Sequence, residues 1–181
     1  ILLLPKSHPN PSTWTALINK SKAFRLHSLL TSPQSFSSTY EREAAFSHSD
    51  WEARLKNPLA YTFVAKSTPT PTPSPSVPAP STHGEHISSF LTSDWVGSAV
   101  LFGPKPTEYD TNSGSTALFD IYGLFVLPSA QGIGLGTALM EACTTHAAPL
   151  AAAMNVDKAV VRVSVTKGNE RVLELYRRIG F

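Results

Sequence analysis

Residues 121–140 read IYGLFVLPSAQGIGLGTALM, and this stretch decides the architecture of the chain. An apolar run stops at Pro128, and glycines then stand at positions 132, 134 and 136, just before an apolar pattern with helical spacing. This order predicts a strand, a tight turn and a helix whose first backbone N–H groups have no partner. Such a turn is suited to hold an anion, most often a phosphate.

Spacing excludes two common phosphate-binding loops. A P-loop requires Lys and then Ser or Thr after its last glycine, but here Thr137 follows that glycine. A dinucleotide-binding loop requires G-x-G-x-x-G, and the last position of that pattern falls on Thr137 or Leu139. The pattern that remains is Q-x-x-G-x-G over residues 131–136.

Residues 169–181, NERVLELYRRIGF, carry a second motif. From Val172 onward, apolar residues recur at i, i+3, i+4 and i+7, so they form one face of a helix. Asn169 is a suitable N-cap and Gly180 a suitable residue to follow the helix end.

The two motifs, in this order and separated by the strand-like residues 159–165, resemble those of the GNAT superfamily of N-acetyltransferases. The first resembles its Q-x-x-G-x-G loop for acetyl-CoA, and the second its N-x-x-x-x-x-L-Y-x-x-x-G-F motif. The resemblance implies an α/β fold, with a mixed sheet whose parallel central strands splay apart. Members usually continue after G-F with two more strands. We therefore expect a chain that stops at Phe181 to be a fragment or a shortened variant.

Composition favours one ordinary globular domain over residues 1–181. The net charge is +2 and the basic residues do not cluster, so no nucleic-acid partner is expected; no apolar run is long enough for a membrane span. The single cysteine, Cys143, excludes an internal disulfide and predicts a reducing compartment, the cytoplasm or alternatively the nucleus. Proline-rich residues 67–82 are predicted to be an inserted surface loop.

Periodicity predicts strands that alternate with helices after an initial meander. The expected strands are residues 1–4, 60–65, 95–102, 117–127 and 158–165. The expected helices are residues 12–30, 39–55, 134–148 and the final motif, 169–181. A loop is expected at 31–38 and a turn region at 103–115. This order implies a mixed sheet whose last two strands are parallel.

The resemblance implies that acetyl-CoA lies along the first motif. Backbone N–H groups of residues 131–137 would wrap its pyrophosphate, and a bulge at Gly123 would open the sheet beside the pantetheine. The Val126 N–H is the expected oxyanion donor. Asn169 either contacts the CoA arm or only caps its helix. The expected cofactor-binding residues are Leu124, Phe125, Val126, Gln131, Gly132, Ile133, Gly134, Leu135, Gly136, Thr137 and Asn169.

Asp120 is the candidate general base, because some family members carry a catalytic Glu on this strand. Strand alternation places it on one face with Tyr122, Leu124 and Val126. Two alternatives stay open: Asp120 is a solvated surface residue, or the amine loses its proton to solvent without a base.

Tyr176 is the candidate proton donor to the departing thiolate, and a buried aromatic without a chemical role is its alternative. Cys143 and His146 follow the apolar face of their helix and are predicted to be structural. His83 and His86 have metal-ligand character, but no further ligand lies nearby, so no metal is expected.

The function implied is transfer of an acetyl group from acetyl-CoA to a primary amine, by direct attack in a ternary complex. The loop at 31–38 is expected to line the acceptor site; it is Ser-rich and uncharged, so a small-molecule amine and a protein amine both stay open. The main alternative is a CoA-binding module with weak catalysis or none. An interaction protein that uses the proline-rich segment is a third alternative, which leaves both motifs unexplained.

Overall fold

A computed structural model describes residues 1–67, 83–106, 116–156 and 158–181, and the proline-rich residues 68–82 lie outside this part. Among the described residues, five strands form one sheet in the order β1-β2-β3-β4-β5. Neighbouring strands are antiparallel up to β4, and β4 and β5 are parallel. This arrangement confirms the predicted mixed sheet. The strands are β1 (Leu2–Leu3), β2 (Ala60–Lys66), β3 (Trp95–Pro106), β4 (Thr116–Val126) and β5 (Lys158–Val163).

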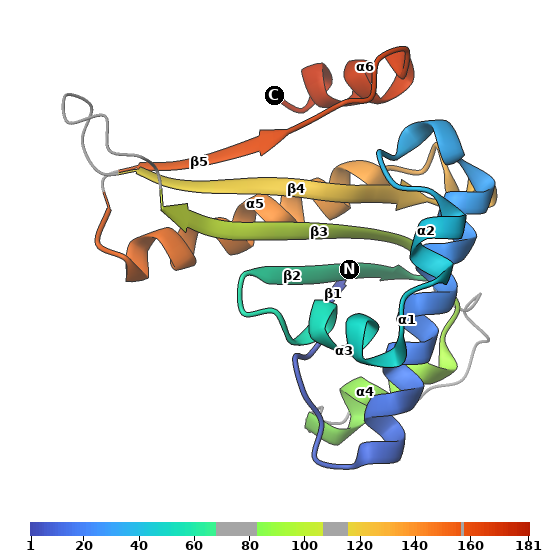
Figure 1. Ribbon diagram of the computed structural model, residues 1–181. Helices are drawn as coiled ribbons and strands as arrows, with labels where there is room; N and C mark the ends of the chain where they lie inside the picture. Colours follow the sequence, from blue (N-terminus) through green and yellow to red (C-terminus); the bar gives the residue numbers. More distant parts are fainter. Residues whose placement is uncertain (68–82, 107–115, 157) are drawn as a thin grey trace, which may run out of the picture.

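Helices cover both faces of this sheet. The helices are α1 (Pro11–Thr31), η1 (Pro33–Ser35), α2 (Tyr40–Ala44), α3 (His48–Lys56), α4 (His83–Thr92), η2 (Pro128–Ala130), α5 (Leu135–Ala153) and α6 (Glu170–Arg178). In Figure 1, α5 crosses behind the strands, α2 and α3 lie on the near side, and α6 follows the end of β5. Of the helices in the described ranges, none combines the length and the apolar character that a bilayer crossing requires.

Two hydrophobic cores lie on opposite faces of the sheet. Adjacent residues of a strand point to opposite faces, and the neighbours Phe63 and Val64 of β2 belong to different cores. The first core packs against α5 through Leu139 and Cys143. The second gathers Trp14 of α1 with residues from α3 and α4. The two cores therefore hold helices on both faces of the sheet.

Three differences from the predicted helices have local causes. α1 begins earlier than expected because the Asn10 side chain caps it, accepting from the Thr13 N–H at 3.0 Å. The predicted helix 39–55 is two helices, α2 and α3, because Ser47 and Asp50 form a capping box that starts a new helix. α4 is absent from the prediction, and its Ile87 anchors it in the second core.

Two elements run further than predicted. β3 reaches Pro106, because an irregularity between Phe102 and Lys105 lets its pairing with β4 continue through the expected turn. α5 reaches Ala153 and passes through Pro149, an exposed position. The helix tolerates that proline on its solvent face at the cost of one backbone hydrogen bond.

Candidate active site

The two parallel strands separate towards their carboxyl ends. The pairing of β4 with β5 stops at Ile121 and Val163, although β4 continues to Val126. On the other edge of β4, the Leu127 N–H donates to the Val96 carbonyl oxygen of β3 at 2.8 Å. Because N–H directions alternate along a strand, the Val126 N–H points to the edge that has lost its partner strand. The predicted oxyanion donor therefore lies at the open edge.

A β-bulge marks the start of the separation. Between Tyr122 and Phe125, β4 has two residues where β3 has one. Gly123 is one of these two residues, and its φ of 61° lies in the left-handed region that glycine adopts without strain. The predicted bulge at Gly123 is confirmed.

The bulge also corrects a prediction about the faces of β4. One extra residue shifts the alternation, so Leu124 and Val126 pack against the core on the α5 face. Phe125 lies on the opposite face, with its ring 5.9 Å from that of Phe24 between centroids. The prediction that Leu124 and Val126 share a face with Asp120 and Tyr122 is therefore wrong, because simple alternation takes no account of the bulge.

The glycine loop has the geometry of an anion-binding cradle. Gly132 and Gly134 have φ values of 84° and 86°, and no atom lies within 4 Å of where a Cβ would stand on either. Within the part of the chain that the structure describes, the N–H groups of residues 132–137 make no hydrogen bond. The Gln131 side chain donates to the Val126 carbonyl oxygen at 2.9 Å and so fixes the loop to the end of β4. Free N–H groups at a helix N-terminus suit a diphosphate.

The third glycine has a different role. A Cβ on Gly136 would stand 3.3 Å from Cδ2 of Leu175, so the first turn of α5 packs tightly on α6. This contact brings α6, with its tyrosine, against the glycine loop.

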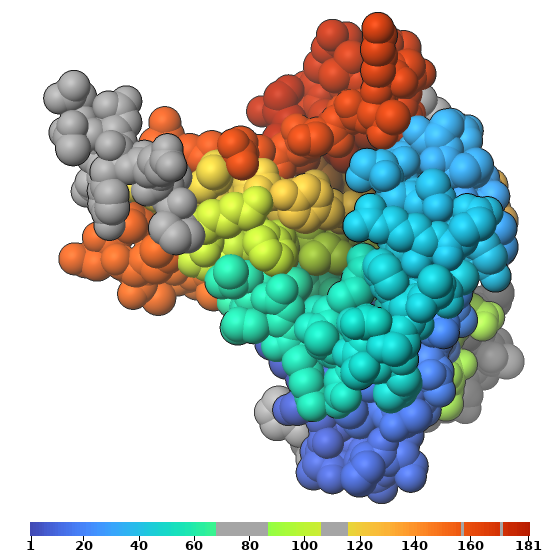
Figure 2. Space-filling model, in the orientation of Figure 1, coloured from blue at the N-terminus to red at the C-terminus, as the bar shows by residue number. Residues whose placement is uncertain are grey.

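A cleft of about 1730 Å³ joins these parts. In Figure 2 the surface is hollowed between α6 and the segment that includes η1 and α2, with β4 beneath. Most of the predicted site residues line this cleft, whereas Ile133 and Asp120 do not. Those that line it are Leu124, Phe125, Val126, Gln131, Gly132, Gly134, Leu135, Gly136, Thr137, Asn169 and Tyr176.

Tyr176 lies on α6, largely buried, with part of its side chain lining the cleft. Its hydroxyl has no hydrogen-bond partner among the described residues. Burial, and to a smaller extent the neighbouring Cys143 thiol, raise the pKa of the Tyr176 hydroxyl. The group therefore stays protonated at neutral pH and is able to donate a proton.

Asp120 does not itself line the cleft, and a polar network holds its carboxylate. Its carboxylate accepts from Nζ of Lys105, from Nε of Arg162 at 3.0 Å and from the Tyr122 hydroxyl at 3.1 Å. Burial alone would raise the pKa of this carboxyl, but the hydrogen bonds from Lys105 and then Arg162 outweigh burial and lower it. A carboxylate with these partners is a weak base, and this environment suits the predicted catalytic role poorly. Its contacts instead connect β3, β4 and β5.

Asn169 joins two parts of the site. Its Oδ1 accepts from the Val172 N–H at 3.4 Å and so caps α6, and its Nδ2 donates to Oγ of Ser35 in η1 at 3.3 Å. The predicted acceptor loop, residues 31–38, lines the cleft on this side.

The sequence prediction missed the charged groups of the acceptor half. The Glu43 carboxylate is buried and accepts from Arg25 Nη2 at 2.8 Å and from Arg54 Nη1 at 2.9 Å. Burial opposes ionisation of Glu43, but hydrogen bonding and charge from Arg25, with Arg54, lower its pKa below the usual value. These three residues come from three separate helices, so no local sequence motif predicts their contact.

The remaining titratable candidates lie in the first core. Cys143 is fully buried, and His146 packs its ring 4.7 Å from that of Tyr61 and 5.5 Å from that of Phe63. Burial, and then the charge of Lys6, lower the pKa of His146. Both side chains pack in or against the first core, which agrees with the predicted structural role. The described residues contain no metal-binding group of three or more His, Cys, Asp or Glu. The side chains of residues 83–86 lie outside the described part.

Comparison with known proteins identifies the family. The model of the acetyltransferase (GNAT) family matches residues 82–181, which is more than half of the chain. The chain therefore belongs to the GNAT family, whose members are acetyl-CoA-dependent N-acetyltransferases. A search of curated proteins found no match.

Solved structures share the fold at low sequence identity. NAA60 of Arabidopsis thaliana, in complex with a bisubstrate analogue, superposes with a TM-score of 0.59 at 13% identity, over 99% of this chain and 83% of that one. An aminoglycoside acetyltransferase from an uncultured soil metagenomic sample, meta-AAC0020 in complex with trehalose, superposes with a TM-score of 0.57 at 17% identity. The match covers 99% of this chain and 86% of that one. AAC(6')-Iy in complex with a bisubstrate analogue superposes with a TM-score of 0.52 at 14% identity, over 91% of this chain and 83% of that one.

Proposed function

We propose that this chain transfers the acetyl group of acetyl-CoA to a primary amine by direct attack, with both substrates bound together. The observation that carries this proposal is the continuity of the cleft. One cavity is lined by the glycine loop at 131–137, by the open edge of β4 and by the acceptor half around Glu43. Two substrates held in this cavity can meet without a covalent enzyme intermediate.

Each part of the chain has a proposed task. The N–H groups of residues 132–137 bind the pyrophosphate, with Asn169 beside the CoA arm. The Val126 N–H donates to the thioester oxygen on which negative charge develops during attack. The amine nitrogen forms the new bond to the acetyl carbon while the carbon–sulfur bond breaks, and Tyr176 gives its proton to the departing sulfur.

The proton of the amine goes to solvent in this proposal. Two carboxylates line the acceptor half, and both already hold other groups: Glu43 binds two arginines, and Asp50 accepts from the Ser47 hydroxyl at 2.7 Å. Asp120 does not line the cleft, so we assign it a structural role. The variant Asp120→Asn tests its predicted catalytic role. We also propose that residues 1–181 form one domain, because both cores share the same sheet.

Because Glu43 and Asp50 both have partners and Asp120 does not line the cleft, a second candidate is a CoA-binding module without catalysis. The test is thermal unfolding of the chain with and without acetyl-CoA, followed by initial-rate kinetics on a panel of amines. A ligand at about a hundred times its Kd stabilises by ~2.7 kcal/mol, which corresponds to roughly 5–10 °C for a domain of this size.

A shift that disappears in Gly134→Glu supports the cofactor site, and a cooperative transition without a shift overturns it. Intersecting initial-rate lines support direct attack, whereas parallel lines contradict it. A shift with no turnover on any amine would leave the binding module as the function.

A further inference from the structure

The acceptor half of the cleft has more positive than negative charge. Arg25, Arg42 and Arg54 line it, against Glu43 and Asp50. Glu43 holds Arg25 and Arg54, and Oδ2 of Asp50 accepts from both the N–H and the hydroxyl of Ser47, at the start of α3. Three cations thus face two carboxylates, and one net positive charge remains in this half.

Arg25 has one unused end, which lies beside the bulge of β4. Its Nε and Nη2 bind Glu43, and no partner of its Nη1 lies among the described residues. A Cβ on Gly123 would stand 3.7 Å from that Nη1, so the free end lies over the bulge where the edge of β4 opens. The guanidinium is held in place on the ring of Phe36, 4.5 Å from its centroid.

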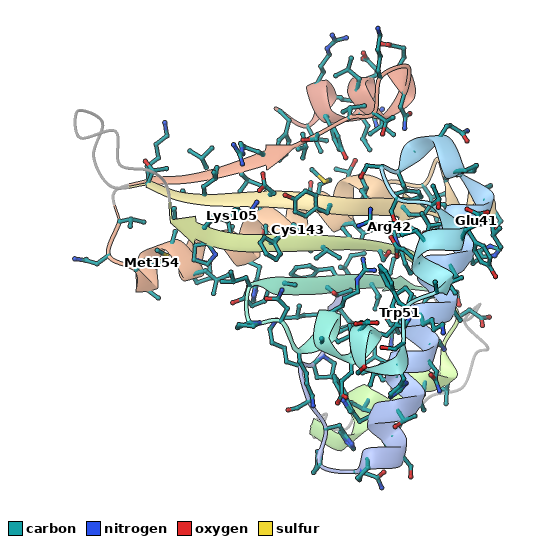
Figure 3. All side chains as sticks on the ribbon, viewed as in Figure 1. Glu41, Arg42, Trp51, Lys105, Cys143 and Met154 are labelled. Carbon is teal, nitrogen blue, oxygen red and sulfur yellow. The ribbon has the colours of Figure 1, made fainter. Side chains whose placement is uncertain are left out.

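Arg42 supplies a second unpaired cation. Figure 3 shows Arg42 on the side of α2 that faces the sheet, and Glu41 on the opposite side. Arg42 lines the cleft, and within the described residues it forms no ion pair. Glu43, Arg25 and Arg54 together carry one further positive charge, so this region repels a bare ammonium group and attracts an anion.

We propose that the acceptor is a primary amine that also carries an oxyanion, a carboxylate or a phosphate, which Arg25 and Arg42 bind. This inference rests on the proposed function and names its substrate class. Guanidinium groups present paired N–H donors that fit carboxylate and phosphate oxygens. The same positive charge lowers the pKa of the bound amine and favours its neutral, nucleophilic form.

The test compares pairs of amines that differ in the oxyanion. β-Alanine is compared with its amide, and O-phosphoethanolamine with ethanolamine, on the full chain with acetyl-CoA. We expect kcat/KM to favour the anionic member of at least one pair by about tenfold or more, as for a charge-assisted bidentate contact. The pair with the larger ratio identifies the oxyanion as carboxylate or phosphate.

Variants assign the preference to the arginines. Arg42→Gln removes a cation with no ion-pair partner to lose, so folding is preserved and the anionic-to-neutral ratio should fall by about tenfold. Arg25→Lys keeps the charge beside buried Glu43 but removes the fork, and it should lower the ratio in the same direction. Arg177→Gln is the matched control, because Arg177 is exposed on α6 and does not line the cleft; it should keep the ratio.

The outcomes separate this inference from the proposed function. Turnover with no preference for anionic amines, or a preference that Arg42→Gln retains, overturns the substrate class and leaves the acetyltransferase function standing. Thermal unfolding with CoA present measures binding of the amine independently of turnover. If no amine turns over, yet the anionic amine stabilises the wild type more than its neutral partner does, and Arg42→Gln abolishes that difference, the substrate class stands and the proposed function fails. The absence of both turnover and stabilisation overturns both.

Discussion

The Asn169 side-chain amide donates to the Ser35 hydroxyl at 3.3 Å, although the two residues are 134 positions apart in the chain. One residue starts α6, and the other ends η1 in the connection between α1 and α2. Both residues line the cleft, one beside the glycine loop and the other in the acceptor half. A single polar contact thus ties the wall of the cofactor half to the wall of the acceptor half.

This contact predicts different costs for its two ends. Asn169→Ala removes the α6 cap as well as the link, so it should lower the free energy of unfolding by about 1 kcal/mol. Ser35→Ala removes only the link and should cost less, about 0.5 kcal/mol. Urea unfolding of both single variants and the double variant measures the coupling. Equal losses for the two single variants would contradict the capping role of Asn169.

Tyr176→Phe should separate turnover from cofactor binding. The variant keeps the buried ring and loses only a hydroxyl, so we expect kcat to fall about 100-fold while the Kd for CoA changes little. Because the pKa of Tyr176 is raised, the wild-type rate should decline only above about pH 10, where the proton is lost, and the variant should lack that decline. Steady-state rates from pH 7 to 11 check both effects; an unchanged kcat would exclude Tyr176 as the proton donor.

Asp120→Asn should affect stability more than catalysis. The Asp120 pKa is lower in the folded state than in the unfolded state, so its ion pairs stabilise fully above about pH 4, and this contribution is lost as the pH falls through the folded pKa. We expect a loss of about 1–2 kcal/mol at pH 7, since the arginine and lysine partners are partly solvated, and a much smaller loss near pH ~2. Denaturant unfolding at both pH values measures this.

The matched control for Asp120 is Glu41→Gln, an exposed carboxylate without an ion pair among the described residues. Because Glu41 lies in the first turn of α2, we expect a loss of only about 0.5 kcal/mol or less, well below that of Asp120→Asn. A large fall of kcat in Asp120→Asn, with stability maintained, would restore the catalytic assignment that the geometry disfavours.

Gly134→Ala tests whether the glycine loop binds CoA. The added Cβ meets no atom within 4 Å, so the variant causes no steric clash. The φ of Gly134 is positive, so alanine should cost about 1 kcal/mol of folding free energy and should weaken CoA binding by displacing the loop N–H groups. Gly180→Ala is the control, because Gly180 also has a positive φ and open space around it but does not line the cleft. Calorimetry with CoA should show weaker binding for the first variant alone; equal binding by both would contradict the cradle.

Cys143 offers a probe of folding. Burial raises the pKa of its thiol to about 12, so the native protein holds almost no thiolate at neutral pH. A disulfide reagent should therefore react with Cys143 only when α5 leaves the sheet, at a rate that rises with urea. Rapid labelling of the native protein at pH 7 would contradict its place in the core.

The parts of the site that a local pattern encodes were predictable. The glycine spacing at 131–136 and the L-Y-x-x-x-G-F ending predicted the loop, α5 and α6, and Gly180 closes α6 as expected, with a φ of 93°. The Phe181 N–H donates to the Tyr176 carbonyl and the Gly180 N–H to that of Arg177, which completes the helix end.

What the sequence left out depends on contacts between distant segments. In β4 the bulge at Gly123 shifts the alternation of side chains between the two faces. The bulge depends on the pairing of β4 with β3, so the residue pattern of β4 alone does not predict it. The charges of the acceptor half come from α1, α2 and α3, and each arginine alone looks like an ordinary surface residue. Likewise, nothing near Asp120 in the sequence reveals that Lys105 and Arg162 occupy its carboxylate, because strand pairing brings them together.

The bulge at Gly123 decides which side chains of β4 face the core and which face the opposite side. Upstream of it, odd-numbered residues such as Phe119 face α5, and downstream even-numbered ones such as Leu124 do so. If β4 kept all its residues but lost the bulge, simple alternation would turn Phe125 to the α5 face and Leu124 to the other side, and the open edge would present the N–H groups of different residues. With this number of residues between Phe119 and Val126, β4 needs the bulge in order to serve a core with one part of its length and a cleft with the other.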